Sequence, residues 1–262
     1  MKILFIGDIV GKGGRRAVAA LAPVLRRQYG CAIIVANGEN MAAGAGLNAK
    51  CIRSVTPAPM VDVITGGDHM WDQKEFAQEA DLFPWVLRPA NLPACQPARG
   101  GGVFLATDGL PVGVVCLQGR TFINSQADCP FAAADRMIEE LRPHTAIVVV
   151  DFHGEATSEK IAMGRYLDGR ASVVLGTHTH VATADEQILP GGTAYQTDVG
   201  MVGGRESVLG REIKPVLHRF TTGMPARFNV VETNIRLNAT LVEVCPESGR
   251  ATGIERIVRD FD

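Results

Sequence analysis

Short apolar runs, rich in β-branched residues, alternate with polar, helix-like segments through most of the chain. The runs occupy residues 2–6, 31–37, 61–65, 112–119, 144–152 and 171–176. They lack the strict alternation of a strand with one solvent-facing side, so we expect strands that are covered on both faces. Helices are expected between them, around 14–29 and within 71–83, 128–143 and 154–169.

Two helix boundaries and a change of pattern complete the predicted organisation. Asp128 is a suitable N-cap with Pro130 at an early helical position, and Gly169 is a suitable C-cap. From about residue 226 the pattern becomes that of antiparallel strands with a turn at 246–249. The sequence therefore predicts one α/β domain over residues 1–262, with a central sheet or a pair of sheets, finished by β-hairpins.

The composition is that of a globular protein, and it disfavours several functions. The chain is 46% hydrophobic and 21% charged, and its net charge of −2 gives no electrostatic footprint for nucleic acid. Its six cysteines are far apart and form no C-x-x-C pair, which indicates thiols in a reducing cytoplasm. The N-terminal apolar run is too short for a signal peptide, and no stretch approaches the roughly 20 apolar residues of a membrane helix.

Polar residues that can bind metal ions follow five of the predicted strands. Functional groups in open α/β sheets gather beyond the carboxyl ends of the strands, and these strands can lie side by side in one sheet. In chain order, the candidates are Asp8, Glu39, Asn40, Asp68, His69, His153, His178 and His180.

Each candidate also has a structural explanation when it is taken alone. Asp8 can cap the next helix, Asn40 can be a turn residue, and His69 can be packed against Trp71. His178 and His180, two residues apart, would face the same way on an exposed strand edge even if they bound no ligand. However, four of the six histidines lie at three strand exits together with carboxylates, and packing does not explain this joint pattern. The pattern favours a metal site.

The residue types indicate which metals and how many. Imidazole and carboxylate ligands without thiolate suit Zn, Mn or Fe. Without His69, the seven remaining candidates exceed the usual ligands of one ion, so we expect two ions. A carboxylate can bridge a pair of ions about 3.5–4 Å apart, and such pairs promote phosphoryl displacement. One histidine of the pair at 178 and 180 is then expected on each ion.

Several motifs resemble those of a known family. The segments GDIVG, NGEN, G-x-H-x-WD, DFHxEATSEK and GTHTHVxTAD occur in this order from residue 7 to residue 185. They are similar to the YmdB-type metallophosphoesterases, which are bacterial dimetal enzymes of the calcineurin-like superfamily associated with phosphodiesterase activity on 2′,3′-cyclic nucleotides. The resemblance continues past TDVGM at 197–201 and covers most of the chain.

The resemblance implies a fold and a role for each candidate. The fold is a four-layer α/β/β/α sandwich. Asp8, Glu39, Asn40 and His180 would bind one metal, and Glu39, Asp68, His153 and His178 the other, with Glu39 as the bridge. His69 would donate a proton to the leaving oxygen or stabilise the transition state. A metal-bridging hydroxide would attack the phosphorus of a small phosphodiester in line.

Asp68 departs from the family pattern, which has Asn in the corresponding G-N-H segment. Two divalent ions, two carboxylates and a bridging hydroxide leave one net positive charge, and Asp68 removes it. A mixed-valence Fe(III)/Fe(II) pair would restore that charge. The expected cofactors are therefore two ions, Fe(III)/Fe(II) or Mn, with Zn also suitable.

Other signals lead to weaker expectations. The segment 7–16 fits no phosphate-loop pattern and is expected to form a turn over the metal site, from which Lys12, Arg15 or Arg16 can approach a substrate phosphate. Residues 98–103 are expected to form a flexible loop. The glycine-rich segment 197–210 is either a substrate-facing loop or a plain connection. No G-x-S-x-G elbow occurs, which disfavours a serine hydrolase.

Alternatives to a phosphodiesterase remain open from the sequence. One is a dimetal hydrolase of another bond, such as an amide. Another is a regulatory protein whose metal centre binds a nucleotide as a signal without turnover. A homo-oligomer is also possible, because the C-terminal strands can pair with a second chain.

Overall fold

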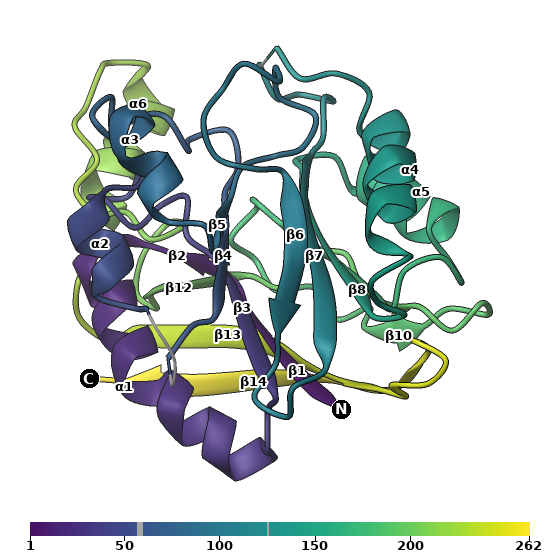
Figure 1. Cartoon of the computed structure of the whole chain (residues 1–262). Coiled ribbons are helices and arrows are strands. Elements are labelled where there is room, and N and C mark those ends of the chain that lie inside the picture. The colour runs from purple at the N-terminus through teal and green to yellow at the C-terminus, as the bar shows by residue number, and fades with distance from the viewer. Residues whose placement is uncertain (57–59, 125) are drawn as a thin grey trace.

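Two β-sheets pack against each other in this computed structural model, and helices cover the outer face of each sheet (Figure 1). The structure describes residues 1–56, 60–124 and 126–262. Helices α1, α2 and α3 lie on one side of the paired sheets, and α4 and α5 lie on the other. The layers therefore run α/β/β/α, which confirms the predicted fold.

The first sheet has eight strands in the order β2-β12-β13-β1-β3-β4-β5, with β14 paired to β13. Strands β1, β3, β4 and β5 are parallel, whereas β13 is antiparallel to β1. The strands are β1 Lys2–Ile6, β2 Asp8–Ile9, β3 Ile33–Asn37, β4 Val63–Thr65, β5 Val86–Leu87, β12 Met201–Gly204, β13 Ile235–Val244 and β14 Ala251–Phe261.

The second sheet has six strands in the order β10-β11-β9-β8-β7-β6. Strands β7, β8, β9 and β11 are parallel, and the edge strands β6 and β10 are antiparallel to their neighbours. The strands are β6 Gly101–Leu105, β7 Pro111–Gln118, β8 Val148–His153, β9 Val173–Thr177, β10 Gln187–Ile188 and β11 Ala194–Gln196.

The continuous apolar runs arise because each central strand has a buried neighbour on both faces. In β1, Phe5 packs in the core between the two sheets, while Leu4 and Ile6 pack against the helices outside. In β8, Val149 faces the core between the sheets and Val150 faces α4 and α5. Successive side chains of a strand point to opposite faces, so both classes of position must be apolar.

Four of the helices lie approximately where the sequence predicts them, namely α1, α3, α4 and α5, whereas α2 and α6 were not predicted. They are α1 Gly11–Tyr29, α2 Ala49–Arg53, α3 Phe76–Glu79 with the 3₁₀ turn η1 Ala80–Leu82, α4 Pro130–Leu141, α5 Thr157–Tyr166 and α6 Ile213–Thr222. None of the helices in the described ranges is long and apolar enough to span a membrane. The C-terminal hairpin of β13 and β14 is confirmed.

Several predicted details are wrong. The N-cap of α4 is Cys129 rather than Asp128, although Pro130 does occupy the first turn. Helix α5 ends before Gly169: its C-cap is Leu167, whose side chain is buried in the core. Residues 98–103 are not simply a loop, since β6 begins at Gly101 and pairs with β7. Segment 197–210 contains the strand β12.

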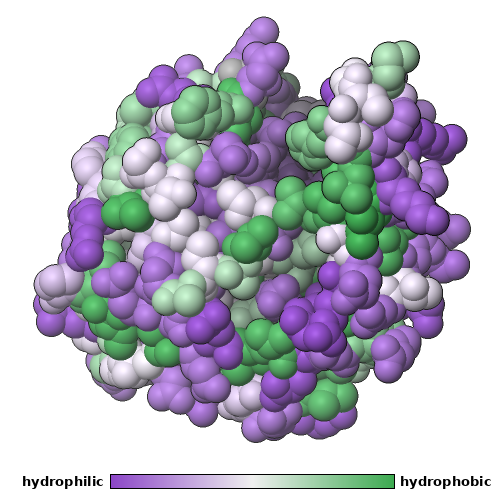
Figure 2. Space-filling view, turned by 180° about the vertical axis from the view of Figure 1, so that it is seen from behind, coloured by the Kyte–Doolittle hydropathy of each residue, from purple (hydrophilic) through white to green (hydrophobic). Residues whose placement is uncertain are grey.

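Helix α6 was not predicted, and it is the most exposed of the long helices. Only Val216 is buried within it, whereas Leu217 is 53% exposed and Phe220 is 80% exposed. Figure 2 shows hydrophobic surface at the upper right, over the position that α6 has in Figure 1. An amphipathic pattern with its apolar side in solvent is unusual for a globular protein.

Candidate metal centre

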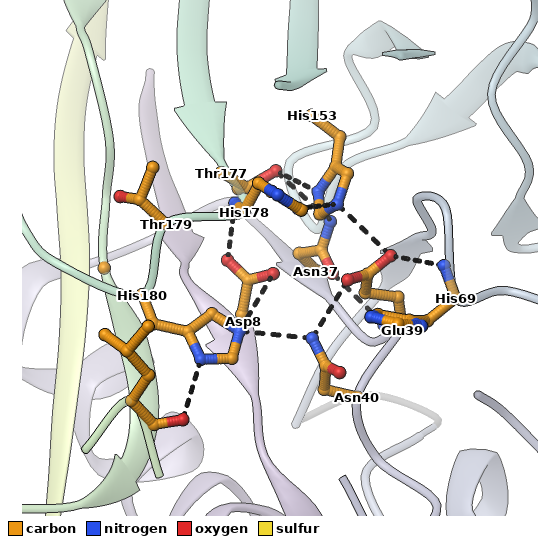
Figure 3. Close-up of polar contacts among 12 residues, drawn as sticks. Asp8, Asn37, Glu39, Asn40, His69, His153, Thr177, His178, Thr179 and His180 are labelled. Carbon is orange, nitrogen blue, oxygen red and sulfur yellow. Dashed lines mark hydrogen bonds and ion pairs between the residues drawn. The ribbon is translucent and has the colours of Figure 1, made fainter. Parts of the chain in front are cut away.

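The eight candidate residues meet at one place, but they come from both sheets. Strands β1, β3 and β4 of the first sheet and β8 and β9 of the second lead into the segments that carry these residues. The side chains labelled in Figure 3 converge on one place. The expectation that one sheet carries all of them is therefore wrong. The packing of two sheets brings together candidate residues as far apart in the sequence as Asp8 and His180.

Four of these residues form a compact group that can hold a metal ion. One ligand atom from each of Glu39, Asp68, His153 and His178 lies within 4.8 Å of the others. His153 Nε2 is 3.2 Å from Glu39 Oε2 and 3.0 Å from Asp68 Oδ1. His178 Nδ1 is 3.0 Å from the same His153 nitrogen. The donor atoms thus converge on one small region.

Three further candidates, Asp8, Asn40 and His180, lie on the other side of Glu39. Asn40 Nδ2 is 3.0 Å from Glu39 Oε1 and 3.2 Å from His180 Nε2. His180 Nε2 is 3.9 Å from Asp8 Oδ1. That Asp8 oxygen is buried and has no hydrogen-bond partner. A buried carboxylate oxygen without a donor is costly, and a cation would satisfy it. Asn40 would have to turn its amide oxygen inward to bind an ion.

The electrostatics of the centre also favour cations. Burial raises the pKa of Asp8 well above its ordinary value, and the carboxylates of Glu39, Asp198 and Asp151 add to the rise against an opposing effect of His153. Burial alone would lower the pKa of His153, but Glu39, Asp68 and Asp8 outweigh it and raise that pKa strongly. Buried negative charge contributes to both shifts, in addition to the burial of Asp8 itself. Two metal ions would compensate this charge.

A buried network that the sequence did not reveal orients His153. Its Nδ1 lies 2.9 Å from Thr177 Oγ1, and that hydroxyl donates to Asp151 Oδ1 at 2.8 Å. The hydroxyl proton of Thr177 is donated to Asp151, so the hydroxyl oxygen can only accept a hydrogen bond from His153 Nδ1. This places the ring proton on Nδ1 and leaves Nε2 of His153 free to bind a metal ion. Asp151 also accepts from Asn37 and Thr65. These residues are inside or beside the quoted motifs, but no local pattern shows their contacts.

A second buried network holds the turn that carries His178 and His180. Both histidines have positive φ angles, 102° and 64°. Asp198 Oδ2 accepts from the backbone N–H of Thr179 at 3.0 Å and from its hydroxyl at 2.8 Å. Lys160 Nζ lies 2.6 Å from the same oxygen. Left-handed backbone at non-glycine residues is strained, and this anchor supports it.

His69 lies at the edge of the centre. Its side chain is 43% exposed, and its Nδ1 is 2.8 Å from Asp72 Oδ2. Burial would lower the pKa of His69, but Glu39, Asp68 and Asp72 raise it above its usual value. The ring is therefore held by Asp72 at Nδ1 and carries a proton more readily than a free imidazole.

A cavity of about 330 Å³ opens onto the centre. His69, His178 and His180 are among the side chains that line it, as are Glu155 and Arg211. Volumes of this order are typical of small-molecule sites. Arg15 and Arg16 do not line the cavity: Arg15 donates to Met41 O and Ser54 Oγ, and Arg16 lies over the ring of Phe261. The expectation that they approach a substrate is wrong, because residues 11–16 belong to α1.

The family model described as YmdB-like protein matches residues 4–257. The chain belongs to the YmdB-like family. The match of the family model confirms the resemblance that was inferred from the motifs.

Other YmdB-like proteins and solved structures match along nearly the whole chain. A 2′,3′-cyclic-nucleotide 2′-phosphodiesterase of Bacillus subtilis (strain 168) is 44% identical over 262 residues, which is 100% of this chain and 98% of the relative. A crystal structure of a hypothetical protein from Thermus thermophilus superposes with a TM-score of 0.89 at 41% identity and covers 99% of both chains. A crystal structure of a novel phosphatase from Mycoplasma pneumoniae has a TM-score of 0.91 at 32% identity, with 99% of this chain and 93% of that one covered.

Proposed function

We propose that this YmdB-like chain is a dinuclear metal-dependent phosphodiesterase that hydrolyses 2′,3′-cyclic nucleotides. The observation that carries the proposal is the position of Glu39 between two groups of donors. Its Oε2 faces His153, and its Oε1 faces Asn40. A carboxylate with one oxygen toward each group is what a bridge between two ions requires.

The assignment of ligands follows from this division. Asp8, Asn40 and His180 would share one ion with Glu39, and Asp68, His153 and His178 would share the other with it. Bound ions supply activated water and neutralise charge for an in-line displacement at phosphorus. The buried orphan oxygen of Asp8 and the converging nitrogens of His153 and His178 support this donor set.

His69 is the residue we assign to the leaving group. Asp72 holds its Nδ1, which directs Nε2 away from that contact, toward Asp68 at 3.9 Å and hence toward the centre. A protonated Nε2 at the cavity wall can donate to the alcohol oxygen as the bond to phosphorus breaks.

The cyclic-nucleotide substrate is proposed from the size of the cavity and from the relative in Bacillus subtilis, whose name states that activity. Bacterial relatives of this kind and six free thiols support a location in the cytoplasm. The net charge of −2 gives no reason to expect a nucleic-acid partner.

Iron in a mixed Fe(III)/Fe(II) pair is the metal that we propose first, ahead of Mn and Zn. Asp68 lies 3.0 Å from His153 Nε2 and 3.3 Å from His178 Nδ1, so its charge falls inside the centre rather than in solvent. The extra negative charge favours a more highly charged metal pair. If Asp68→Asn left the relative activities of the Fe-, Mn- and Zn-loaded protein unchanged, this assignment would be wrong.

We also propose that the chain is a single domain. Strand β1 at the N-terminus pairs with β13 near the C-terminus, so neither end can separate without opening the first sheet. One cooperative unfolding transition is expected by calorimetry. The oligomeric contact through the C-terminal strands stays a prediction, which light scattering can test.

The decisive experiment measures metal content and hydrolysis of bis-p-nitrophenyl phosphate together. Wild type, Glu39→Gln and Glu243→Gln are compared, because Glu243 forms only a surface ion pair with Lys2. We expect about two ions per chain and turnover in wild type and Glu243→Gln, and loss of both in Glu39→Gln. One ion or none after reconstitution with Fe or Mn would overturn the proposal, and nucleotide binding without turnover would favour the regulatory alternative.

A further inference from the structure

Arg211 is the one arginine or lysine among the described residues that line the cavity beside the metal centre. The sequence had offered Lys12, Arg15 or Arg16 as residues that could approach a substrate phosphate. Arg211 instead follows the turn at Leu209 and Gly210, where φ is 51° and 86°. This turn belongs to the glycine-rich segment 197–210, so that segment does face the cavity at Leu209.

The guanidinium of Arg211 is held only by neutral carbonyl groups. Its Nη1 donates to Ala43 O and Phe228 O, each at 3.4 Å, and its Nη2 donates to Gly44 O at 2.5 Å. Gly44 has no side chain to obstruct this approach, since a Cβ there would lie 2.6 Å from Nη1. The loop after Asn40 is therefore shaped to receive the arginine.

No carboxylate in the described part of the chain forms an ion pair with Arg211. Elsewhere in the described chain Arg170 pairs with Asp135 and Arg236 with Asp260, whereas Arg88, like Arg211, donates to backbone carbonyl groups. A guanidinium has five N–H donors, and three hydrogen bonds to carbonyls do not use them all. Burial lowers the pKa of Arg211, yet the group stays charged at neutral pH. A partly buried cation without a counter-ion favours an anionic ligand.

The turn that carries Arg211 lies on the far side of His180 from the metal-binding atoms. Leu209 O is 3.2 Å from His180 Nδ1, whereas Nε2 of the same ring faces Asp8 and Asn40. The imidazole thus separates this turn from the place where the scissile phosphate would lie. An anion bound by Arg211 would then be a second group on the substrate rather than the group that reacts.

We propose that Arg211 binds a second phosphate, so that the preferred substrate is a cyclic nucleotide with an additional phosphate outside the ring that is opened. This inference rests on the proposed function for the identity of the reacting group. The binding of a second phosphate itself depends only on the cavity and its arginine. The two can therefore be tested separately.

The experiment compares two substrates and two product-like ligands on the Mn-reconstituted protein. The substrates are adenosine 2′,3′-cyclic phosphate with and without a 5′-phosphate. The ligands are adenosine 3′,5′-bisphosphate and adenosine 3′-phosphate, with affinities measured by calorimetry. Arg211→Met removes the charge at similar length and Arg211→Lys keeps it. Arg205→Met is the control from the neighbouring segment 197–210, where the Arg205 side chain pairs with Asp260 on the surface.

We expect wild type and Arg205→Met to prefer the ligand and the substrate that carry the second phosphate. Arg211→Met should lower that preference about ten- to a hundredfold through KM, and Arg211→Lys should restore part of it. If Arg211→Met weakened the binding of both substrates and both ligands equally, the role of Arg211 would be to hold the loop at Ala43 and Gly44, and the inference would be refuted. If wild type hydrolysed neither substrate but still preferred the bisphosphate through Arg211, the proposed function would fail while the phosphate site would stand.

Discussion

Replacing Lys160 with methionine should destabilise the protein by about 3–5 kcal/mol, because it leaves a buried carboxylate without its cation. Lys160 is 1% exposed and Asp198 is 0% exposed, and the two atoms of the pair are 2.6 Å apart. Methionine keeps most of the aliphatic volume, so the loss is mainly electrostatic. For a protein of this size the change corresponds to a fall in Tm of about 6–20 °C.

The same substitution should weaken metal binding, because Asp198 also holds Thr179 between His178 and His180. Loss of a residue that orients metal ligands typically costs about 10- to 100-fold in affinity. Thermal unfolding and competition with a chelator measure the two effects separately. The double variant Lys160→Met/Asp198→Asn removes the unpaired charge and should be more stable than Lys160→Met alone.

Lys2→Met is the matched control, since the pair of Lys2 with Glu243 is exposed on both sides. Surface pairs contribute about 0–1 kcal/mol, so this variant should unfold near the wild-type temperature. If Lys160→Met lost no more stability than Lys2→Met, the buried pair would not support the histidine turn. The same conclusion would follow if the double variant were less stable than Lys160→Met.

Three further predictions test the surroundings of the centre. His69→Ala should reduce hydrolysis about 10²- to 10⁴-fold for esters of aliphatic alcohols and much less for p-nitrophenyl esters, whose leaving group needs no proton; equal defects in steady-state kinetics would exclude proton donation. Thr177→Val should lower metal affinity about 10- to 100-fold by breaking the link from His153 to Asp151, as read by chelator competition, whereas unchanged affinity would show that this link is dispensable. Asp185 is partly desolvated, but hydrogen bonds from Thr183 and Thr197 hold its pKa below the usual value, so it stabilises the fold above pH 3.8 and less as the pH falls through the lowered pKa. Urea unfolding should therefore show a smaller loss of stability on acidification for Asp185→Asn than for wild type, and identical pH profiles would contradict this.

The sequence by itself determined the central strands and the chemistry of their ends. Apolar runs such as those in β1 and β8 predict strands because burial on both faces leaves no place for polar residues. The types of candidate ligand were also readable, because each lies at the end of a strand or within three residues after it. Carboxylates and imidazoles at a strand end have no packing role that would explain their joint occurrence, so a candidate metal site could be predicted before its geometry was known.

Helix boundaries were less predictable, because tertiary packing outweighs local capping preference. Gly169 and Asp128 have suitable residue types for caps, yet α5 stops when Leu167 enters the core and α4 begins at Pro130. Helix α6 was missed although Ile213, Val216, Leu217 and Phe220 recur at helical spacing; its solvent-facing apolar side is a feature that only the structure shows.

Only the tertiary structure decided which polar groups meet. Asn37 contacts Asp151 across 114 residues of sequence, and Lys160 contacts Asp198 across 38. Arg211 reaches Gly44 across 167. No periodicity links such pairs, because each partner belongs to a different strand, helix or loop. The packing of two sheets brings them together, and burial then requires each charge and donor to have a partner.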